Sequence, residues 1–220
     1  MAGEKFFEEW TYVERDGSTS LIYPDGCRDI LVIHRAERLQ GVAVADFDFQ
    51  PRTVTMPAGT GISGYRMRPG TWVSDATLIA ISASPLAAAE IIGNTVLYSA
   101  DIDDAILALG AGGETVHSTA RNAGLSVRSM QRLFASHGLP PPDFWRLLCR
   151  ARKAVHGLRA DVPLADLAYA AGYSDQAHMT RDLVRWFGAS PSKLREDART
   201  LNLISQPALG NWTGEQISTR

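Results

Sequence analysis

The chain has 220 residues, of which 45% are hydrophobic and 21% are charged, and its net charge is −2 at pH 7. This is the composition of an ordinary globular protein, and it excludes a largely disordered chain. No apolar run approaches the roughly 20 residues that a membrane span needs. The N-terminus, MAGEKFFEEW, carries acids where a signal peptide carries a basic and then an apolar region. These features predict a cytoplasmic protein without a membrane partner.

The small net charge hides a difference between the two halves of the chain. Residues 1–113 carry 8 Lys and Arg against 15 Asp and Glu, a net charge of −7. Residues 114–199 carry 13 against 8, a net charge of +5. A basic segment joined to an acidic one is typical of a nucleic-acid-binding unit attached to a sensing or assembly unit.

The first hundred residues predict short strands separated by turns. LIYPDGCRDILVI places β-branched and aromatic residues on both sides of Pro24-Asp25-Gly26, which is a turn sequence. VAVADFDFQ alternates apolar with small or acidic residues, and its slip at Ala45-Asp46 predicts a β-bulge. Short apolar pieces between Pro and Gly follow over residues 51–70. This spacing predicts a barrel-like or sandwich-like β module.

Helical patterns begin with SASPLAAAEII, where Ser84 is the predicted N-cap and Pro85 takes the first helical position. From Asp101 the apolar period is helical, and it remains so to about residue 198. We therefore predict an α+β chain with a β-rich sensing or assembly module over 1–100, an all-α domain over 101–199, and a tail over 200–220 that we leave unassigned.

The helical half contains a degenerate repeat. Ala120-x-x-x-Gly124-Leu125-Ser126 returns 48 residues later as Ala168-x-x-x-Gly172-Tyr173-Ser174, and a Met-x-Arg-x-apolar step follows each copy, now 49 residues apart. A small residue at a helix crossing, a glycine that ends the helix in the left-handed conformation and a serine N-cap predict a helix-turn-helix. Two such motifs are therefore predicted, over about 114–137 and 163–188, and the second helix of such a motif can enter a DNA major groove.

The helix after the second turn has two faces of different character. Its apolar residues recur at helical spacing and should face inward; they are Met179, Leu183, Trp186 and Phe187. Between the motifs, PPPDFWRLLCRARKAVHGLRA predicts a long linker helix whose buried stripe is Phe144, Leu147, Leu148, Ala151 and Val155. Two recognition helices on such a linker could enter successive major grooves roughly 34 Å apart.

Two stretches carry a pattern known from one family. They are ARNAGLSVRSMQRLF with GLPPPDFWRLL, and PLADLAYAAGYSDQAHMTRDLVRWFGASPSKLR, which contains the Gly-aromatic pair and closes on Phe-Gly-x-Ser-Pro. Through them, residues of about 101–199 resemble the DNA-binding domain of AraC/XylS-type transcriptional regulators. YPDGCRDILVI and GYRMRPG resemble the short β-rich module that precedes this domain in some members.

The resemblance implies which residues contact DNA. Base edges would be contacted by Arg128, Gln131 and Arg132 in the first recognition helix and by Gln176, Ala177, His178 and Arg181 in the second. The candidates for phosphate contacts, which position without specifying sequence, are Ser126, Thr180, Arg185 and Lys193. The implied partner is double-stranded DNA, and binding at the N-terminal module could alter either DNA affinity or contact with RNA polymerase. The chain is expected not to be an enzyme.

Other chemistry finds less support in the sequence. Six residues fit either a pocket for a small anionic or aromatic effector or the core of the β module, and both interpretations stay open; they are Trp10, Tyr12, Tyr65, Arg66, Arg68 and Trp72. Cys27 and Cys149 lie far apart without a CxxC, so neither a disulfide framework nor a zinc cluster is predicted. We expect no catalytic residue, no metal and no cofactor.

The sequence thus predicts a sequence-specific DNA-binding transcriptional regulator that reads two successive major grooves and is modulated by an effector or partner at its N-terminal module. A regulator that acts without a ligand is one alternative. A small-molecule-binding or enzymatic β-domain with a helical assembly domain is another. Steep salt dependence of DNA binding would separate the regulators from this last class. The sequence does not set the oligomeric state.

Overall fold

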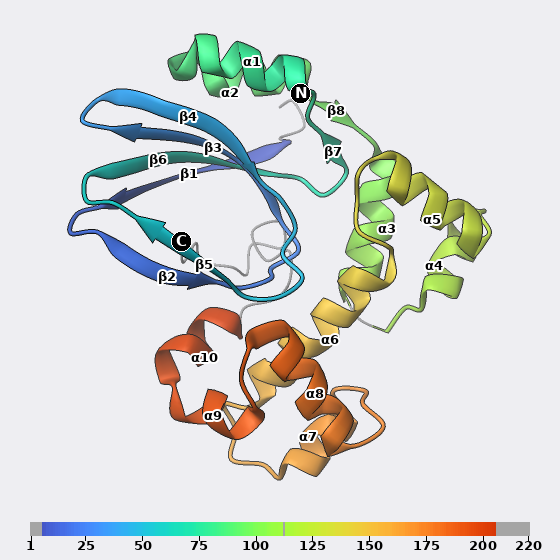
Figure 1. The fold of residues 1–220 in the computed structure, drawn as a ribbon. Coiled ribbons are helices and arrows are strands. Elements are labelled where there is room, and N and C mark those ends of the chain that lie inside the picture. The colour runs from blue at the N-terminus through green and yellow to red at the C-terminus, as the bar shows by residue number, and fades with distance from the viewer. Residues whose placement is uncertain (1–5, 112, 206–220) are drawn as a thin grey trace.

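The computed structural model describes residues 6–111 and 113–205. Strands and two helices form the N-terminal region, and helices form the rest (Figure 1). The α+β class predicted from the sequence is confirmed, with a β-rich region followed by helices that include two helix-turn-helix units. The strands are β1 (Phe7–Glu14), β2 (Ser18–Ile22), β3 (Arg28–Arg35), β4 (Arg38–Ala45), β5 (Arg52–Met56), β6 (Thr60–Met67), β7 (Thr71–Trp72) and β8 (Leu97–Tyr98).

The larger sheet has four antiparallel strands in the order β1-β6-β3-β4. β2 pairs with β5 in a separate ribbon that lies across from the concave side of this sheet, and β7 pairs with β8 (Figure 1). Gly26, in the predicted Pro24-Asp25-Gly26 turn, has φ of 77°. This turn leads from β2 to β3, so it connects the two layers instead of closing a hairpin.

The outer face of the larger sheet is covered by helices that the sequence only partly predicted. α1 (Asp75–Ala83), a 3₁₀ turn η1 (Pro85–Ala87) and α2 (Ala88–Thr95) pack on it (Figure 1). Ser74 caps α1 by accepting a hydrogen bond from the Thr77 amide, at 3.1 Å. Ser84 is the N-cap and Pro85 the first helical residue as predicted, but the helix that they open is the 3₁₀ turn η1 that leads into α2, and Ser84 is also the C-cap of α1.

The expectation for VAVADFDFQ needs two corrections. β4 ends at Ala45, and Phe47 and Phe49 leave the sheet to pack on Phe144 of the helical region, with ring centroids 6.1 and 4.9 Å apart. The register shift lies between Ile33 and His34 of β3, opposite β4, and not at Ala45-Asp46. Ala36 and Glu37, which both have positive φ, close a two-residue hairpin, and the extra residue lies in β4 between Leu39 and Gly41.

The helical region is built around the linker helix α6. Its helices are α3 (Ala100–Ala111), α4 (Val116–Asn122), α5 (Val127–Ser136), α6 (Asp143–Gly157), α7 (Leu164–Ala170), α8 (Gln176–Phe187), α9 (Pro191–Glu196) and α10 (Ala198–Ile204). In the predicted stripe of α6, Phe144, Leu148, Ala151 and Val155 are buried and Leu147 is half-buried. Of the tail, residues 206–220 lie outside the described residues, while α10 covers its start.

The N-terminal and helical regions share one hydrophobic core. Cys27 is buried in the cluster that contains Trp145 and Phe134, and Tyr23 and Phe47 pack against that cluster. The Phe47 ring meets the Trp145 ring at 5.7 Å, edge to face. The helical region is therefore packed directly against the turn and loop that leave the β-sheets.

Candidate DNA-binding surface

The two helix-turn-helix units use the same backbone hydrogen bond at the turn. In the first unit the Leu125 amide donates to the Ala120 carbonyl at 2.8 Å, and in the second the Tyr173 amide donates to the Ala168 carbonyl at 2.9 Å. The glycines between them, Gly124 and Gly172, have φ of 69° and 83°, as predicted for a left-handed helix end. The sequence repeat is therefore a structural repeat.

The crossing of the two helices in each unit is close because its contact residue is small. Ala120 and Ala168 are both completely buried. Met130 and Phe134 of α5, and Met179 and Leu183 of α8, are also buried. The inward faces predicted for α8, including Trp186 and Phe187, are thus confirmed.

The N-caps of the two recognition helices differ. Ser126 caps α5 as predicted, accepting a hydrogen bond from the Ser129 amide at 3.1 Å. The same role predicted for Ser174 is wrong, because Asp175 caps α8 by accepting from the His178 amide at 2.6 Å. Asp175 is the extra residue that changes the repeat offset from 48 to 49. This hydrogen bond to a backbone amide also lowers the pKa of Asp175 below its ordinary value.

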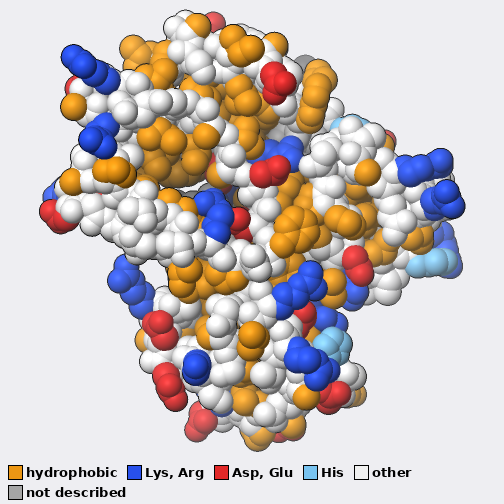
Figure 2. All heavy atoms as spheres, in the orientation of Figure 1, with side chains coloured by type: hydrophobic (Ala, Val, Ile, Leu, Met, Phe, Trp, Pro, Cys, Tyr) orange, Lys and Arg blue, Asp and Glu red, His pale blue; other side chains and the backbone are white. Residues whose placement is uncertain are grey.

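Most of the predicted DNA-contacting side chains are exposed. On α5 and its cap these are Ser126, Arg128, Gln131 and Arg132; on α8 they are Gln176, Ala177, Arg181 and Arg185, and Lys193 of α9 is exposed as well. His178 and Thr180 are half-buried, and the Thr180 hydroxyl donates to the Gln176 carbonyl at 2.9 Å. In Figure 2, Lys and Arg side chains lie over α4–α5 and over the part of the helical region that holds α8, and others lie over the β-strands.

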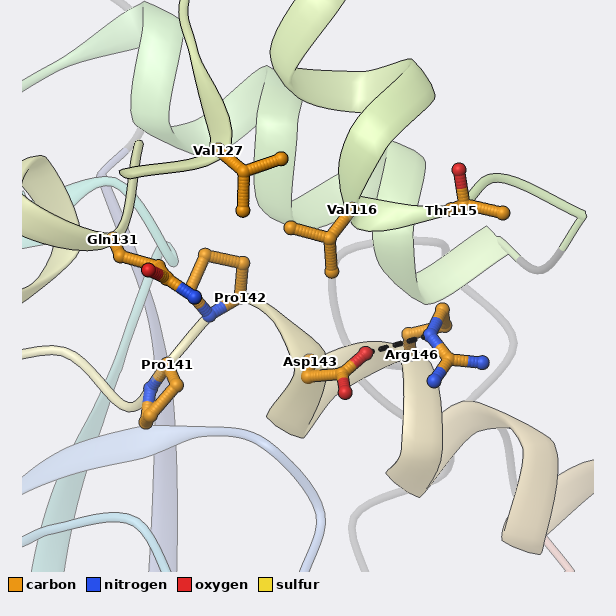
Figure 3. A pocket seen from close by; sticks show the side chains of 8 residues that line it. All are labelled: Thr115, Val116, Val127, Gln131, Pro141, Pro142, Asp143 and Arg146. Carbon is orange, nitrogen blue, oxygen red and sulfur yellow. Dashed lines mark hydrogen bonds and ion pairs between the residues drawn. The ribbon is translucent and has the colours of Figure 1, made fainter. Parts of the chain in front are cut away.

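Gln131 differs from the other predicted base contacts in what lies beside it. It lines a pocket of about 460 Å³ between the starts of α4, α5 and α6 (Figure 3). The lining residues are Thr115, Val116, Val127, Gln131, Pro141, Pro142, Asp143 and Arg146. Two of these lining residues bond to each other at the start of α6, where Arg146 donates to Asp143 at 2.7 Å (Figure 3). Gln131 therefore lies at the edge of the α5 surface, next to the linker.

A buried ionic network connects the linker helix to the second recognition helix. Arg150 of α6 donates to the Asp182 carboxylate at 2.8 Å, and the Tyr173 hydroxyl donates to the same carboxylate at 3.0 Å. The Arg150 guanidinium also stacks on the Tyr173 ring, 4.2 Å from its centroid. Burial and the neighbouring Asp182 charge raise the pKa of Tyr173, so its hydroxyl remains a donor.

Sequence reasoning missed this network, although a signal was present. Asp182 lies three residues after Met179 and four before Trp186, so it is on the buried face of α8. A carboxylate on that face requires a partner.

His178 is oriented by its neighbours at the second turn. The Tyr173 ring meets the imidazole edge to face with centroids 5.1 Å apart. The Ser174 hydroxyl lies 3.1 Å from His178 Nδ1. Since Nδ1 is engaged by Ser174, Nε2 is the ring nitrogen left for a base edge.

The structure does not gather the six candidate effector-pocket residues at one place. Trp10 pairs with Gly64, and Arg66 lies on the same inner face of the sheet, where both side chains hydrogen-bond to Asp29. Tyr12 also lies on this face and donates to Glu14 at 2.8 Å. Strand alternation places Tyr65 on the opposite face, under α1 and α2.

The remaining two candidates lie elsewhere. Arg68 donates to Asp103 of α3 at 2.7 Å and stacks on Tyr98. Trp72 is 42% exposed on β7. Three of the six, Trp10, Tyr12 and Arg66, therefore share the inner face.

Comparison with known proteins assigns the helical region. A family model described as a helix-turn-helix domain matches residues 119–197. The match runs from within α4 to the end of α9. The helical region therefore contains a helix-turn-helix domain, the kind of unit that can place its second helix in a DNA major groove. No curated protein matches the chain.

Several solved structures are similar to parts or most of this chain. An AraC-type regulator from Chromobacterium violaceum is 21% identical, covers 44% of this chain and 89% of its own, with a TM-score of 0.40. A probable AraC family regulator from Rhodopseudomonas palustris is 23% identical, covers 46% of this chain and 99% of its own, and has a TM-score of 0.38. ToxT from Vibrio cholerae is 8% identical, covers 87% of this chain and 98% of its own, and has a TM-score of 0.43. Scores this low do not establish a shared overall fold, so the assignment rests on the family model.

Within the described part of the chain, no helix has the length and apolar character needed to cross a membrane. Cys27 is buried and Cys149 is half-buried, and both are free thiols.

Proposed function

We propose that α5 and α8 read two successive major grooves on one face of a DNA duplex, with α6 as the spacer. The observation that carries this proposal is the repeated turn. The same amide-to-carbonyl bond, the same positive-φ glycine and an exposed polar face on the second helix occur in both units. A helix-turn-helix presents its second helix to the major groove.

In this arrangement base reading falls to the exposed side chains near the start of each recognition helix. Arg128 and Arg132 on α5, and Gln176 and Arg181 on α8, can each form two hydrogen bonds to one base edge. His178 adds one bond through Nε2, and Ala177 permits close approach or contacts a thymine methyl. Gln131 takes part from the linker side of α5. Ser126, Thr180, Arg185 and Lys193 contact phosphates.

The first experiment is selection of bound sequences from a random DNA pool, followed by affinity measurements on the selected site. Arg132→Ala and Arg181→Ala should each relax preference at one position, at a cost of about 1 to 3 kcal/mol in discrimination. Lys193→Ala should weaken binding to all sequences alike and reduce the slope of log K against log salt by about 1.

Arg38→Ala, on the exposed β3–β4 hairpin, is the matched control for loss of one positive charge. It should leave both the sequence preference and the slope of log K against log salt unchanged. Absence of binding by the wild-type chain at low salt would contradict the proposal and favour an assembly role for the helices.

The N-terminal region is the proposed site of modulation by a small anionic or aromatic effector on the inner face that holds Trp10, Tyr12 and Arg66. RNA polymerase contact is proposed for the same region, where the acidic charge lies. Thermal unfolding of the full chain with a broad panel of metabolites tests the effector. A melting temperature that no compound shifts would count against it.

A further inference from the structure

One six-residue segment, 23–28, contacts both helix-turn-helix units and the linker between them. At its start the Tyr23 ring packs against Phe187, the last residue of α8, with ring centroids 6.5 Å apart. At its end Arg28 Nη2 donates to the Gly138 carbonyl at 2.9 Å, just beyond the end of α5. The segment therefore spans from the exit of one recognition helix to the exit of the other.

The middle of segment 23–28 is bonded to the linker helix. Arg152 of α6 donates through Nε to the Pro24 carbonyl at 3.0 Å, and its Nη2 donates to the same oxygen. Arg152 is only 3% exposed, and its Nη1 also reaches the Ile204 carbonyl of α10 at 3.4 Å. A buried guanidinium that donates hydrogen bonds to backbone carbonyls fixes the relative position of the segments that it joins.

The segment is held to the β-sheet by buried ion pairs. Arg66 of β6 bonds Asp25 at 3.0 Å and Asp29, at the start of β3, at 3.1 Å. Arg66, Asp25 and Asp29 are 3%, 7% and 0% exposed. The Asp25 carboxylate also accepts from the Cys27 amide at 3.0 Å, which fixes the shape of the turn. Segment 23–28 thus moves with the sheet, because separating these charges in a dry environment is costly.

The exits of α5 and α8 are consequently tied together by two supports, α6 on one side and segment 23–28 on the other. We propose that segment 23–28 sets the relative position of the two recognition helices, and thereby the spacing between DNA half-sites that the chain accepts. Arg28 and Arg152 are its positioning residues, since each acts through the helix that it holds. This inference rests on the proposed function, in which α5 and α8 each read one major groove.

The test uses the full chain and a set of duplexes in which the two selected half-sites have centres about 8 to 13 base pairs apart, bracketing one helical turn. A duplex with one half-site completes the set. Affinities are measured by fluorescence anisotropy for the wild type, Arg28→Ala, Arg28→Gln and Arg152→Lys. Arg38→Ala is the control, because it removes an exposed arginine from the same sheet.

The wild type should prefer one spacing and bind about tenfold more weakly two base pairs away, where the second groove is rotated out of reach. Arg28→Ala and Arg28→Gln should reduce this difference to about twofold while leaving affinity for the single half-site unchanged, because each unit still reads its own groove. Arg152→Lys should flatten the profile in the same way, since lysine cannot bond two carbonyls in a fixed plane. Arg38→Ala should keep the wild-type profile.

The possible outcomes separate the two proposals. If the wild type binds no duplex, the proposed function fails and this inference fails with it. If the variants bind with the wild-type spacing profile, or lose affinity equally for every duplex including the single half-site, the inference is overturned and the proposed function stands. Circular dichroism confirms folding, and Arg28→Gln and Arg152→Lys keep the test decisive should Arg28→Ala not fold.

Discussion

Asp182 is a charged residue on the buried face of a recognition helix, and its partners come from two other elements. Arg150 belongs to the linker α6 and Tyr173 to the turn between α7 and α8. Its burial made a partner predictable from the sequence, because Met179 and Trp186 on either side of it are core residues. The identity of the partner was not predictable, because Arg150 is 32 residues away and meets Asp182 only through the crossing of two helices.

Asp182→Ala should destabilise the protein by about 3 kcal/mol, since it leaves the Arg150 guanidinium largely buried without its carboxylate. The side chains of Arg150 and Asp182 are 16% and 10% exposed, so solvent compensates little. The change is measured as the free energy of unfolding in urea.

Asp166→Ala on α7 is the matched control, because that carboxylate is exposed. It should change the free energy of unfolding by no more than about 0.5 kcal/mol. Equal effects of the two substitutions would show that the Asp182 network contributes nothing beyond a surface charge.

At the scale of elements, the helix-turn-helix repeat was predictable because its chemistry is local. Gly124 and Gly172 end helices in the left-handed conformation, and both lie within a few residues of the small alanine and the cap that complete the motif. α1 was missed because DATLIAISA is apolar almost throughout and therefore shows neither helical nor strand periodicity. Its start is set by the Ser74 cap.

Strand partners were less predictable than strand positions. β2 pairs with β5 and β3 pairs with β6, so each of these pairings joins strands that are far apart in the sequence. Phe47 and Phe49 alternate as strand residues would, yet they face the helical region because Phe144 and Trp145 offer them an aromatic surface. The candidate effector residues could be named from the sequence, but the face of the sheet on which each one lies could not be predicted. That face depends on the register of strand pairing.

Gly172→Ala tests the turn of the second unit alone. An alanine at φ of 83° should cost about 1 to 2 kcal/mol of stability, because its Cβ crowds its own backbone. A Cβ at Gly172 would meet no described atom within 4 Å, so no packing clash adds to this effect. Thermal and urea unfolding measure it.

Gly93→Ala in α2 is the companion substitution, because a Cβ there also meets no described atom within 4 Å but the backbone is helical. It should stabilise the protein by about 0.4 to 1 kcal/mol. A loss of stability at both positions would mean that the added methyl group, and not the backbone conformation, is responsible.

At the scale of the whole molecule, the two regions are joined by a common core and not by a flexible connection alone. Tyr23, Cys27 and Phe47 come from the N-terminal region and pack with the cluster that holds Trp145. The sequence predicts a domain boundary near residue 100 but does not indicate this shared core, because the aromatic residues that form it lie about a hundred positions apart, as Phe47 and Trp145 do.

We expect a single unfolding transition. Far-UV circular dichroism and tryptophan fluorescence should give coincident urea midpoints, because the sheet cannot separate without exposing the core around Trp145. Phe47→Ala should lower both midpoints together, whereas Leu21→Ala, at a side chain 48% exposed, should leave them in place. Two well-separated midpoints for the wild type would show that the regions unfold independently.

The difference between the caps of α5 and α8 has a consequence for the orientation of the chain on DNA. The start of α5 keeps the partial positive charge of a helix end, because Ser126 is neutral, whereas the Asp175 carboxylate at the start of α8 offsets that charge. If α5 and α8 both contact DNA as proposed, backbone phosphates would be attracted more strongly to the start of α5 than to the start of α8. A DNA site bound by this chain would then be directional. Inverting the site relative to a promoter would turn a different face of the protein toward any protein bound beside it.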